Sequence, residues 1–249
     1  MSVLRRPRHE RDEGISLVEL LVTMMVMGVI VAATATLVIG AQRTNSQTIA
    51  RLDQVESARN AVERMSRTLR ASVMPSQLLS SCAGCTEDAF VRGEDYEVQF
   101  YANIDNPRNT VGPSRVTYAV AETASGVADL VQTIQIPNSP TPTATGYQYC
   151  DPIADTGPAC QSRVQTMTIA RGVLVDTARP MLTYYSADGP LATSGGALSA
   201  VDLARVLAVE LQVVVQQQTS QRAQPTTYIQ RILLPNAQAV IRQGEEEEA

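Results

Sequence analysis

The stretch ISLVELLVTMMVMGVIVAATATLVI, residues 15–39, decides how this chain is organised. It is 25 residues long and carries a single charge, at Glu19. As a helix it would extend roughly 37 Å, which is long enough to cross a bilayer with some tilt. A buried core helix is the alternative, but the length of the segment and its lack of polar breaks favour a transmembrane helix.

The segment before it, residues 1–14, is polar and contains four arginines, at positions 5, 6, 8 and 11. Because basic residues stay on the cytoplasmic side, we expect a single-pass protein of the cytoplasmic (inner) membrane whose C-terminal part is extracytoplasmic. An ordinary signal peptide with the cleavage motif Ala33-Thr34-Ala35 is a second alternative. The apolar run continues to Ile39 and contains Glu19, and both features count against it.

Glu19 is the most informative residue of this region, because an ionisable group in an apolar segment is costly and usually functional. A cut after Gly14 would make Ile15 the first residue and Glu19 the fifth. The new amine and the carboxylate would then lie near each other, or the carboxylate could neutralise the amine of a neighbouring subunit. The simpler alternative is a carboxylate at the level of the lipid headgroups, one turn from the end of the segment.

These residues resemble the class III signal of type IV prepilins and pseudopilins. The resemblance rests on the short basic leader, Gly14 at the cut, Glu19 at mature position five and the uninterrupted apolar helix. It implies cleavage after Gly14, N-methylation of Ile15 by a prepilin peptidase, and association with other pilins or pseudopilins through the helix. Ile15 replaces the usual Phe, and the helix lacks the proline common in major pilins, which favours a minor subunit.

The helix is expected to continue beyond the membrane, because no proline occurs between Arg8 and Met74 and Pro75 follows. Residues 15–39 would be its transmembrane half and residues 40–74 its soluble half. Its apolar stripe, which we expect to pack on the head, consists of Val55, Ala58, Val62, Met65, Leu69 and Val73. Ile49 and Leu52 lie off the stripe, where they could contact a neighbouring subunit.

Residues 75–240 are expected to form a β-rich head, and residues 241–249 an acidic, disordered tail. Strands are predicted at 96–101, 115–121, 130–136, 164–173, 181–185, 206–215 and 227–234. The head resembles the J-type minor pseudopilins of type II secretion and the W-type minor pilins. That resemblance is carried by ERMSRTLRAS (63–72), RVTYAV (115–120), ARGV (170–173), MLTYYSADG (181–189), RVLAVELQVVV (205–215) and TYIQRILLPN (227–236). It implies a pilin-like α+β fold, with a long N-terminal helix packed on an antiparallel β-rich head.

The composition argues against catalysis and against nucleic acid as a partner. The net charge is −5, all 20 basic residues are arginine, and the one histidine, His9, lies in the leader. Without the leader the chain has no His and no Lys, which excludes a Ser-His-Asp triad, a histidine metal site, a Schiff-base lysine and a phosphate-binding loop lysine. We therefore expect no enzyme, no cofactor and no nucleic-acid binding.

The four cysteines, Cys82, Cys85, Cys150 and Cys160, lie on the exported side, where disulfides persist. Of the three possible pairings we favour Cys82–Cys85 with Cys150–Cys160, because short loops close most readily, and a crossed pairing stays open. A zinc site made by all four thiolates and a Cys-x-x-Cys redox site are the functional alternatives.

Two carboxylates, Asp151 and Asp155, lie between the last two cysteines. They could bind calcium with nearby carbonyls, but two solvated loop residues are the simpler expectation, and no metal site is predicted.

The resulting hypothesis is a structural minor pilin or pseudopilin, whose partners are a prepilin peptidase, other pilin-like subunits and the membrane. The alternative is a membrane-anchored extracytoplasmic binding domain that does not polymerise, and a secreted protein is the third possibility.

Overall fold

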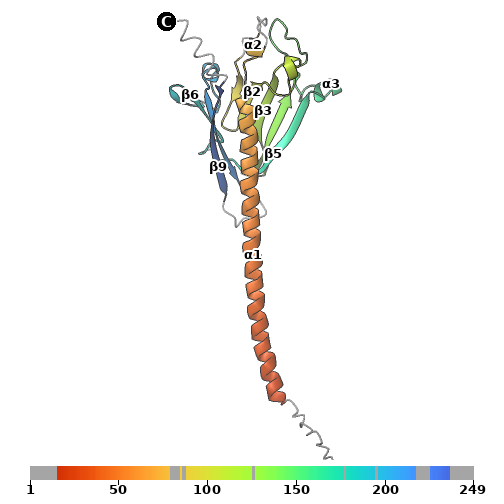
Figure 1. The fold of residues 1–249 in the computed structure, drawn as a ribbon, viewed down its shortest axis with the longest axis vertical. Helices are drawn as coiled ribbons and strands as arrows, with labels where there is room; N and C mark the ends of the chain where they lie inside the picture. Colours follow the sequence, from red (N-terminus) through yellow and green to blue (C-terminus); the bar gives the residue numbers. More distant parts are fainter. Residues whose placement is uncertain are drawn as a thin grey trace, which may run out of the picture. The chain divides into compact units, whose positions relative to one another are not determined.

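The computed structural model describes residues 16–78, 85, 88–124, 127–176, 178–193, 196–216 and 225–235. Within them the chain is an α+β protein with one long N-terminal helix and one nine-stranded antiparallel sheet (Figure 1). By its internal contacts it divides into two units, residues 1–48 and 49–249. The predicted leader 1–14, Ile15 and the acidic tail 241–249 lie outside the described residues.

The helix α1 (Leu17–Arg70) belongs to both units, and its part after residue 48 is amphipathic. Most of the predicted stripe is confirmed, because Ala58, Val62, Met65 and Leu69 are all 0% exposed within the core of the head. Val55 was placed wrongly, since it is 39% exposed. Gln54 takes the buried position instead, because it lies four residues, about one helical turn, before Ala58.

α1 ends at Arg70, four residues before the predicted end at Met74. The helix stops early because the next residues pair with the sheet. The Val73 N–H donates to the Tyr101 carbonyl at 2.9 Å, and the Asn103 N–H donates to the Ala71 carbonyl at 2.9 Å. Sequence periodicity carries no information on such long-range pairing. The helix end is thereby fixed to the end of a strand.

The sheet contains all seven predicted strands, each with ends within three residues of the prediction, and two short strands that were missed. The missed strands are β1 (Phe90–Gly93) and β7 (Gly189–Leu191). Both have four residues or fewer, too few to show an alternating pattern. The others are β2 (Glu97–Ala102), β3 (Ser114–Ala124), β4 (Val127–Gln135), β5 (Val164–Leu174), β6 (Leu182–Ser186), β8 (Ala208–Val215) and β9 (Thr226–Leu233).

The strand order is β1-β2-β3-β4-β5-β8-β6-β7, with β9 also paired to β8. Strands β1 to β5 follow one another as antiparallel neighbours, whereas β5 joins β8 through the single pair Val173↔Val215. The sheet therefore opens at this joint and forms a half-barrel around the end of α1 (Figure 1). Short helices complete the described connections: α2 (Pro75–Leu78), η1 (Pro107–Asn109), α3 (Pro158–Gln161) and α4 (Ala200–Leu203).

The core lies between α1 and the concave face of the sheet. Alternate residues of β2 and β3 point inward, so Val98, Phe100, Val116 and Tyr118 are all 0% exposed. The rings of Phe100 and Tyr118 stack with their centroids 6.3 Å apart. Gln99 and Thr117, which lie between these inward-pointing residues, point to the opposite face of the sheet.

A small polar network ties α1 to the centre of the sheet. The Gln132 side-chain amide donates to the Tyr118 hydroxyl at 2.6 Å and accepts from the Arg64 guanidinium at 2.7 Å. The hydroxyls of Thr68 and Tyr118 are hydrogen-bonded to each other as well. Burial is the main cause that raises the pKa of Tyr118 to about 12.

This pKa predicts that the head loses stability at alkaline pH. The folded state keeps the Tyr118 proton between pH 10 and 12 whereas the unfolded chain releases it, so the contribution of Tyr118 to stability is constant below pH 10 and is lost as the pH rises to 12. The fall from this residue amounts to about 2.7 kcal/mol, since one pKa unit corresponds to about 1.36 kcal/mol. Calorimetric unfolding of the full chain in nanodiscs at pH 8 and pH 11 should measure about half of this fall, about 1.4 kcal/mol, because pH 11 lies midway between the two pKa values.

Tyr118→Phe separates this effect from other tyrosines, because the variant cannot ionise at that position. At pH 8 it should be less stable by about 1–3 kcal/mol, since the Gln132 amide and the Thr68 hydroxyl both lose a hydrogen-bond partner. Between pH 8 and pH 11 it should lose less stability than the wild type. An unchanged alkaline loss in the variant would show that Tyr118 does not titrate in this way.

Candidate functional site

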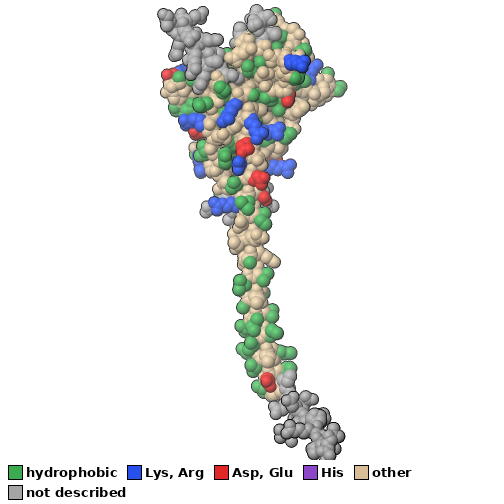
Figure 2. All heavy atoms as spheres, in the orientation of Figure 1, with side chains coloured by type: hydrophobic (Ala, Val, Ile, Leu, Met, Phe, Trp, Pro, Cys, Tyr) green, Lys and Arg blue, Asp and Glu red, His purple; other side chains and the backbone are tan. Residues whose placement is uncertain are grey.

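The described part of the N-terminal unit, residues 16–48, is helical from Leu17, apolar as far as Ile39 and exposed throughout. Figure 2 shows hydrophobic side chains along this part of α1, with few charged ones between them. Among the described residues it is the one helix long and apolar enough to be a candidate membrane span. A helix that is apolar on all sides needs an apolar environment, which a bilayer or neighbouring helices can provide.

The threonine hydroxyls within this segment form hydrogen bonds with the backbone of their own helix. The hydroxyls of Thr23, Thr34 and Thr36 donate to backbone carbonyls three or four residues earlier, at 2.8–3.0 Å. Such bonds remove the need for water or another partner inside hydrocarbon. Between Leu17 and Ile39, Glu19 is therefore the side chain whose polar group the helix does not satisfy.

Glu19 lies in the first turn of α1, where the helix dipole favours a carboxylate. The helix begins immediately before it, since the Leu20 N–H donates to the Ser16 carbonyl at 3.0 Å. Glu19 makes no hydrogen bond or ion pair with any residue that the structure describes. The predicted cleavage and methylation positions, Gly14 and Ile15, lie outside those residues, so processing stays a prediction.

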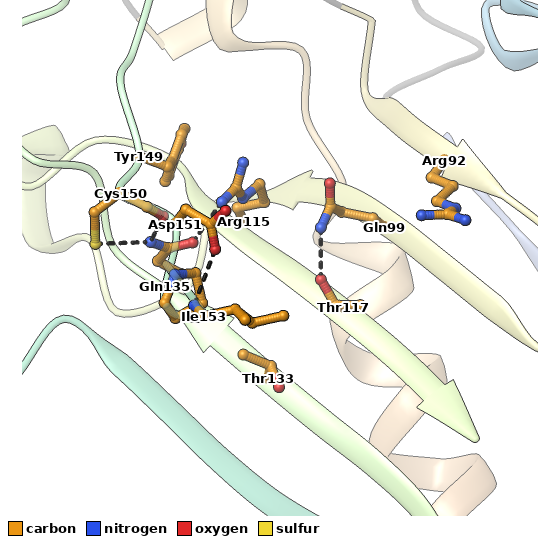
Figure 3. A pocket seen from close by; sticks show the side chains of 11 residues that line it. Arg92, Gln99, Arg115, Thr117, Thr133, Gln135, Tyr149, Cys150, Asp151 and Ile153 are labelled. Atoms are coloured by element: carbon orange, nitrogen blue, oxygen red, sulfur yellow. Dashed lines mark hydrogen bonds between the residues drawn. The ribbon is translucent and has the colours of Figure 1, made fainter. Parts of the chain in front are cut away.

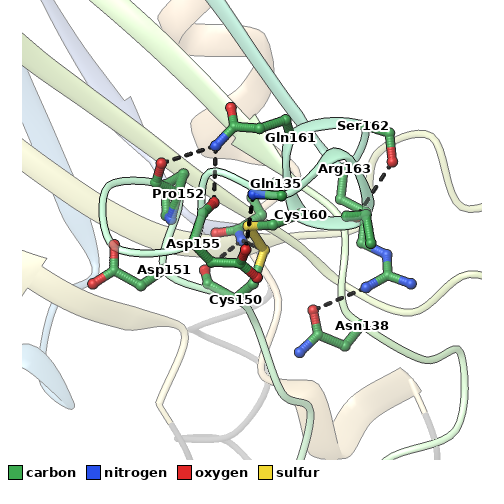
Figure 4. Close-up of a disulfide and its surroundings, with 12 residues drawn as sticks. Gln135, Asn138, Cys150, Asp151, Pro152, Asp155, Cys160, Gln161, Ser162 and Arg163 are labelled. Carbon is green, nitrogen blue, oxygen red and sulfur yellow. Dashed lines mark hydrogen bonds between the residues drawn. A yellow bond between two sulfur atoms is a disulfide. The ribbon is translucent and has the colours of Figure 1, made fainter.

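The predicted Cys150–Cys160 disulfide is present, with Cα atoms 5.9 Å apart (Figure 4). Because these two sulfurs are bonded to each other, the site in which all four cysteines bind zinc is excluded. Cys85 is buried and also disulfide-bonded. Cys82 lies outside the described residues, so its pairing with Cys85 stays a prediction.

The loop closed by the disulfide is held by further hydrogen bonds. Asp151 Oδ1 accepts from the N–H groups of Ile153 and Ala154 at 2.9 and 3.2 Å, and these bonds lower the pKa of Asp151. Asp155 Oδ1 accepts from the Gly157 N–H at 2.9 Å. The two carboxylates considered as calcium ligands thus serve as turn acceptors. The described residues contain no group of three or more His, Cys, Asp or Glu that could hold a metal ion.

Beside this loop, on the face of the sheet turned away from α1, lies a hollow of about 530 Å³ (Figure 3). Its floor is formed by outward-pointing residues of β2, β3 and β4, and one wall is the start of the disulfide loop. It is lined by Arg92, Gln99, Arg115, Thr117, Thr133, Gln135, Tyr149, Cys150, Asp151, Pro152 and Ile153. Sequence reasoning missed this hollow, although alternating polar positions on three strands were a visible signal.

Hydrogen bonds connect the floor of the hollow to its wall. The Arg115 guanidinium donates to Gln135 Oε1 at 2.6 Å and lies 4.7 Å from the centroid of the Tyr149 ring. The Gln135 amide in turn donates to the Cys150 carbonyl at 2.7 Å, and the Tyr149 hydroxyl donates to the Pro113 carbonyl at 2.6 Å. The wall is therefore fixed to the sheet by contacts within the protein.

The described residues thus contain two candidate sites of different kinds. One is the exposed apolar segment with the unpaired carboxylate of Glu19, which suits contact with lipid and with other helices. The other is the polar hollow of the head, which suits a small polar ligand. Comparisons with protein-family models, with curated proteins and with solved structures find no match for this chain.

Proposed function

We propose that this chain is a minor pilin or pseudopilin, a structural subunit of a type IV pilus-like or type II secretion-like filament. The observation that carries the proposal is Glu19, a lone carboxylate without a described partner in the first turn of an exposed apolar helix. A simple membrane anchor gains nothing from such a charge, which only makes insertion more costly. A helix that must recognise another helix inside the membrane gains a specific, directional contact.

The mechanism follows from the electrostatics of a low-dielectric environment. After removal of residues 1–14, Ile15 would carry a positively charged amine four residues before Glu19. Opposite charges attract far more strongly in hydrocarbon than in water, so pairing the carboxylate of one subunit with the amine of its neighbour favours insertion and sets the register. The other apolar residues of the segment provide non-specific contact with lipid and neighbouring helices.

The head supports this proposal through its α+β architecture. The part of α1 after residue 48 packs against an antiparallel sheet, and a head of this kind is what the resemblance to minor pilins and pseudopilins implies. The inner membrane, with the head on the extracytoplasmic side, is the location that fits the arginines of the leader. Prepilin peptidase and other pilin-like subunits are the proposed partners.

Processing tests the proposal directly. Intact-mass and N-terminal peptide spectrometry of the purified protein should find a chain that begins with N-methyl-Ile15. Loss of four arginines and three acidic residues changes the formal net charge from −5 to −6. A matched control is the same protein from cells that lack the peptidase, which should retain residues 1–14 and carry no methyl group.

Two other results would each overturn the processing step. A chain that begins at Thr36 would favour the secreted alternative, with cleavage after Ala35. A chain that keeps its leader in cells with an active prepilin peptidase would favour the membrane-anchored binding domain that does not polymerise.

A further inference from the structure

We propose that the hollow beside the disulfide loop binds a short neutral oligosaccharide. This inference goes beyond a structural role in a filament and does not depend on it, because it rests on the head alone. The hollow measures about 530 Å³, within the range of about 300–1,000 Å³ typical of small-ligand sites. The chemistry of its lining decides the class of ligand.

The lining presents both donors and acceptors that the described residues leave unused. Arg115 donates to Gln135 through one nitrogen, so other guanidinium N–H groups stay available. The Gln99 amide nitrogen donates to the Thr117 hydroxyl at 2.8 Å, so the Gln99 amide oxygen can accept a hydrogen bond from a ligand. Asp151 accepts the two backbone N–H groups through Oδ1, which leaves Oδ2 available as an acceptor for a ligand. A sugar hydroxyl is both donor and acceptor, and adjacent hydroxyls match planar guanidinium, amide and carboxylate groups.

The charged groups in and beside the hollow give no positive excess, which disfavours an anionic ligand. Arg115 and Asp151 have opposite signs on the same side of the hollow. At the other end Arg92 is paired with Glu94 at 2.6 Å and lies 3.6 Å from Glu97. A phosphate or an acidic peptide would need an excess of positive charge, and these groups do not supply one.

Ile153 supplies the apolar surface that a sugar ring also needs. Its side chain is 89% exposed, yet it sits on a turn held by the disulfide and by the Asp151 hydrogen bonds. Figure 3 shows it reaching from the rim over the floor of the hollow. There it can cover the C–H face of a ring while the polar floor binds the hydroxyls. Because the turn is already ordered, binding costs little conformational entropy.

The test uses the full chain in lipid nanodiscs, because an alkyl maltoside detergent would itself supply a sugar. Isothermal titration calorimetry is performed with cellotriose, maltotriose and triacetylchitotriose, and with trigalacturonate as the anionic probe. At least one neutral trisaccharide should bind, and more tightly than trigalacturonate. Ile153→Ser and Thr117→Val should each weaken that binding by about tenfold or more, equivalent to about 1.4 kcal/mol.

Thr168→Val is the matched control, because Thr168 is an exposed threonine of β5 that does not line the hollow. It should bind like the wild type, and all three variants should keep the wild-type unfolding temperature. The proposal is overturned if no neutral trisaccharide binds, if trigalacturonate binds more tightly, or if Ile153→Ser and Thr117→Val bind like the wild type. Subunit association, which depends on Glu19, should be unchanged in these variants, so the two proposals fail independently.

Discussion

Glu19→Val is expected to abolish most of the association between this subunit and other pilin-like subunits, while leaving membrane insertion intact. The substitution removes a charge from an apolar helix, so insertion becomes easier rather than harder. What should disappear is the proposed pairing of the carboxylate with the amine of a neighbouring Ile15. Cleavage after Gly14 should continue, because the substitution leaves the cleavage position unchanged.

The measurement is pairwise association in membranes, by energy transfer between labelled subunits in liposomes. A subunit at the tip of a filament has fewer neighbours than one in the shaft, so counting filaments would underestimate the defect. Glu19→Gln tests whether charge or hydrogen bonding matters, because it keeps the shape and removes the charge. A loss of about tenfold or more is expected for Glu19→Val, equivalent to at least about 1.4 kcal/mol.

Thr23→Val provides the matched control in the same segment. The Thr23 hydroxyl bonds to the Leu20 carbonyl within its own helix, so its removal should not change association. If Glu19→Val associates as well as the wild type, the carboxylate is incidental and the N-terminal helix is a simple anchor. If Thr23→Val loses association as much as Glu19→Val, the contact depends on general helix packing rather than on charge.

The apolar segment and the strands were predictable because their signals are local. A run of 25 residues with one charge and the alternation along β3 or β8 can both be read without knowledge of the fold. The end of α1 was not predictable in the same way. It is set by backbone pairing of residues 71–73 with β2, and no residue before Met74 carries a local stop signal.

Gln54 illustrates a second limit of sequence reasoning. Its side chain is 0% exposed, and neither amide atom has a hydrogen-bond partner among the described residues. A polar residue is normally assigned to the solvent side, so the apolar Val55 was assigned to the stripe instead. The position in the helix decides burial here. Gln54 lies one turn before Ala58 on the helix face that packs on the sheet, whereas Val55 lies at the edge of that face.

The hollow of the head was missed for a related reason. Gln99, Thr117 and Thr133 each read as an ordinary solvent-facing residue of its own strand. The site exists only because β2, β3 and β4 are neighbours and because the disulfide loop folds over one side of them. The cysteines and Asp151 were recognised in the sequence, but their use in building a wall depends on tertiary structure.

Leu69→Ala is expected to lower the free energy of unfolding of the head by about 2–5 kcal/mol, the usual cost of this substitution in a core. Leu69 is 0% exposed and lies one residue before the end of α1, where the helix meets the sheet. Loss of its side chain leaves a cavity between α1 and the strands. Alanine favours helix at least as well as leucine, so the cost comes from packing and not from helix propensity.

Leu52→Ala is the matched control, because it is the same substitution in the same helix at a side chain that is 62% exposed. Its effect on stability should stay within about 0.5 kcal/mol. Calorimetric unfolding of the full chain in nanodiscs should show a midpoint about 4–20 °C lower for Leu69→Ala, at about 2–4 °C per kcal/mol, and little change for Leu52→Ala. Equal effects of the two substitutions would mean that α1 is not packed on the sheet along this face.

Leu52→Ala also tests the separate expectation that Ile49 and Leu52 face a neighbouring subunit, because it should then weaken association without changing stability.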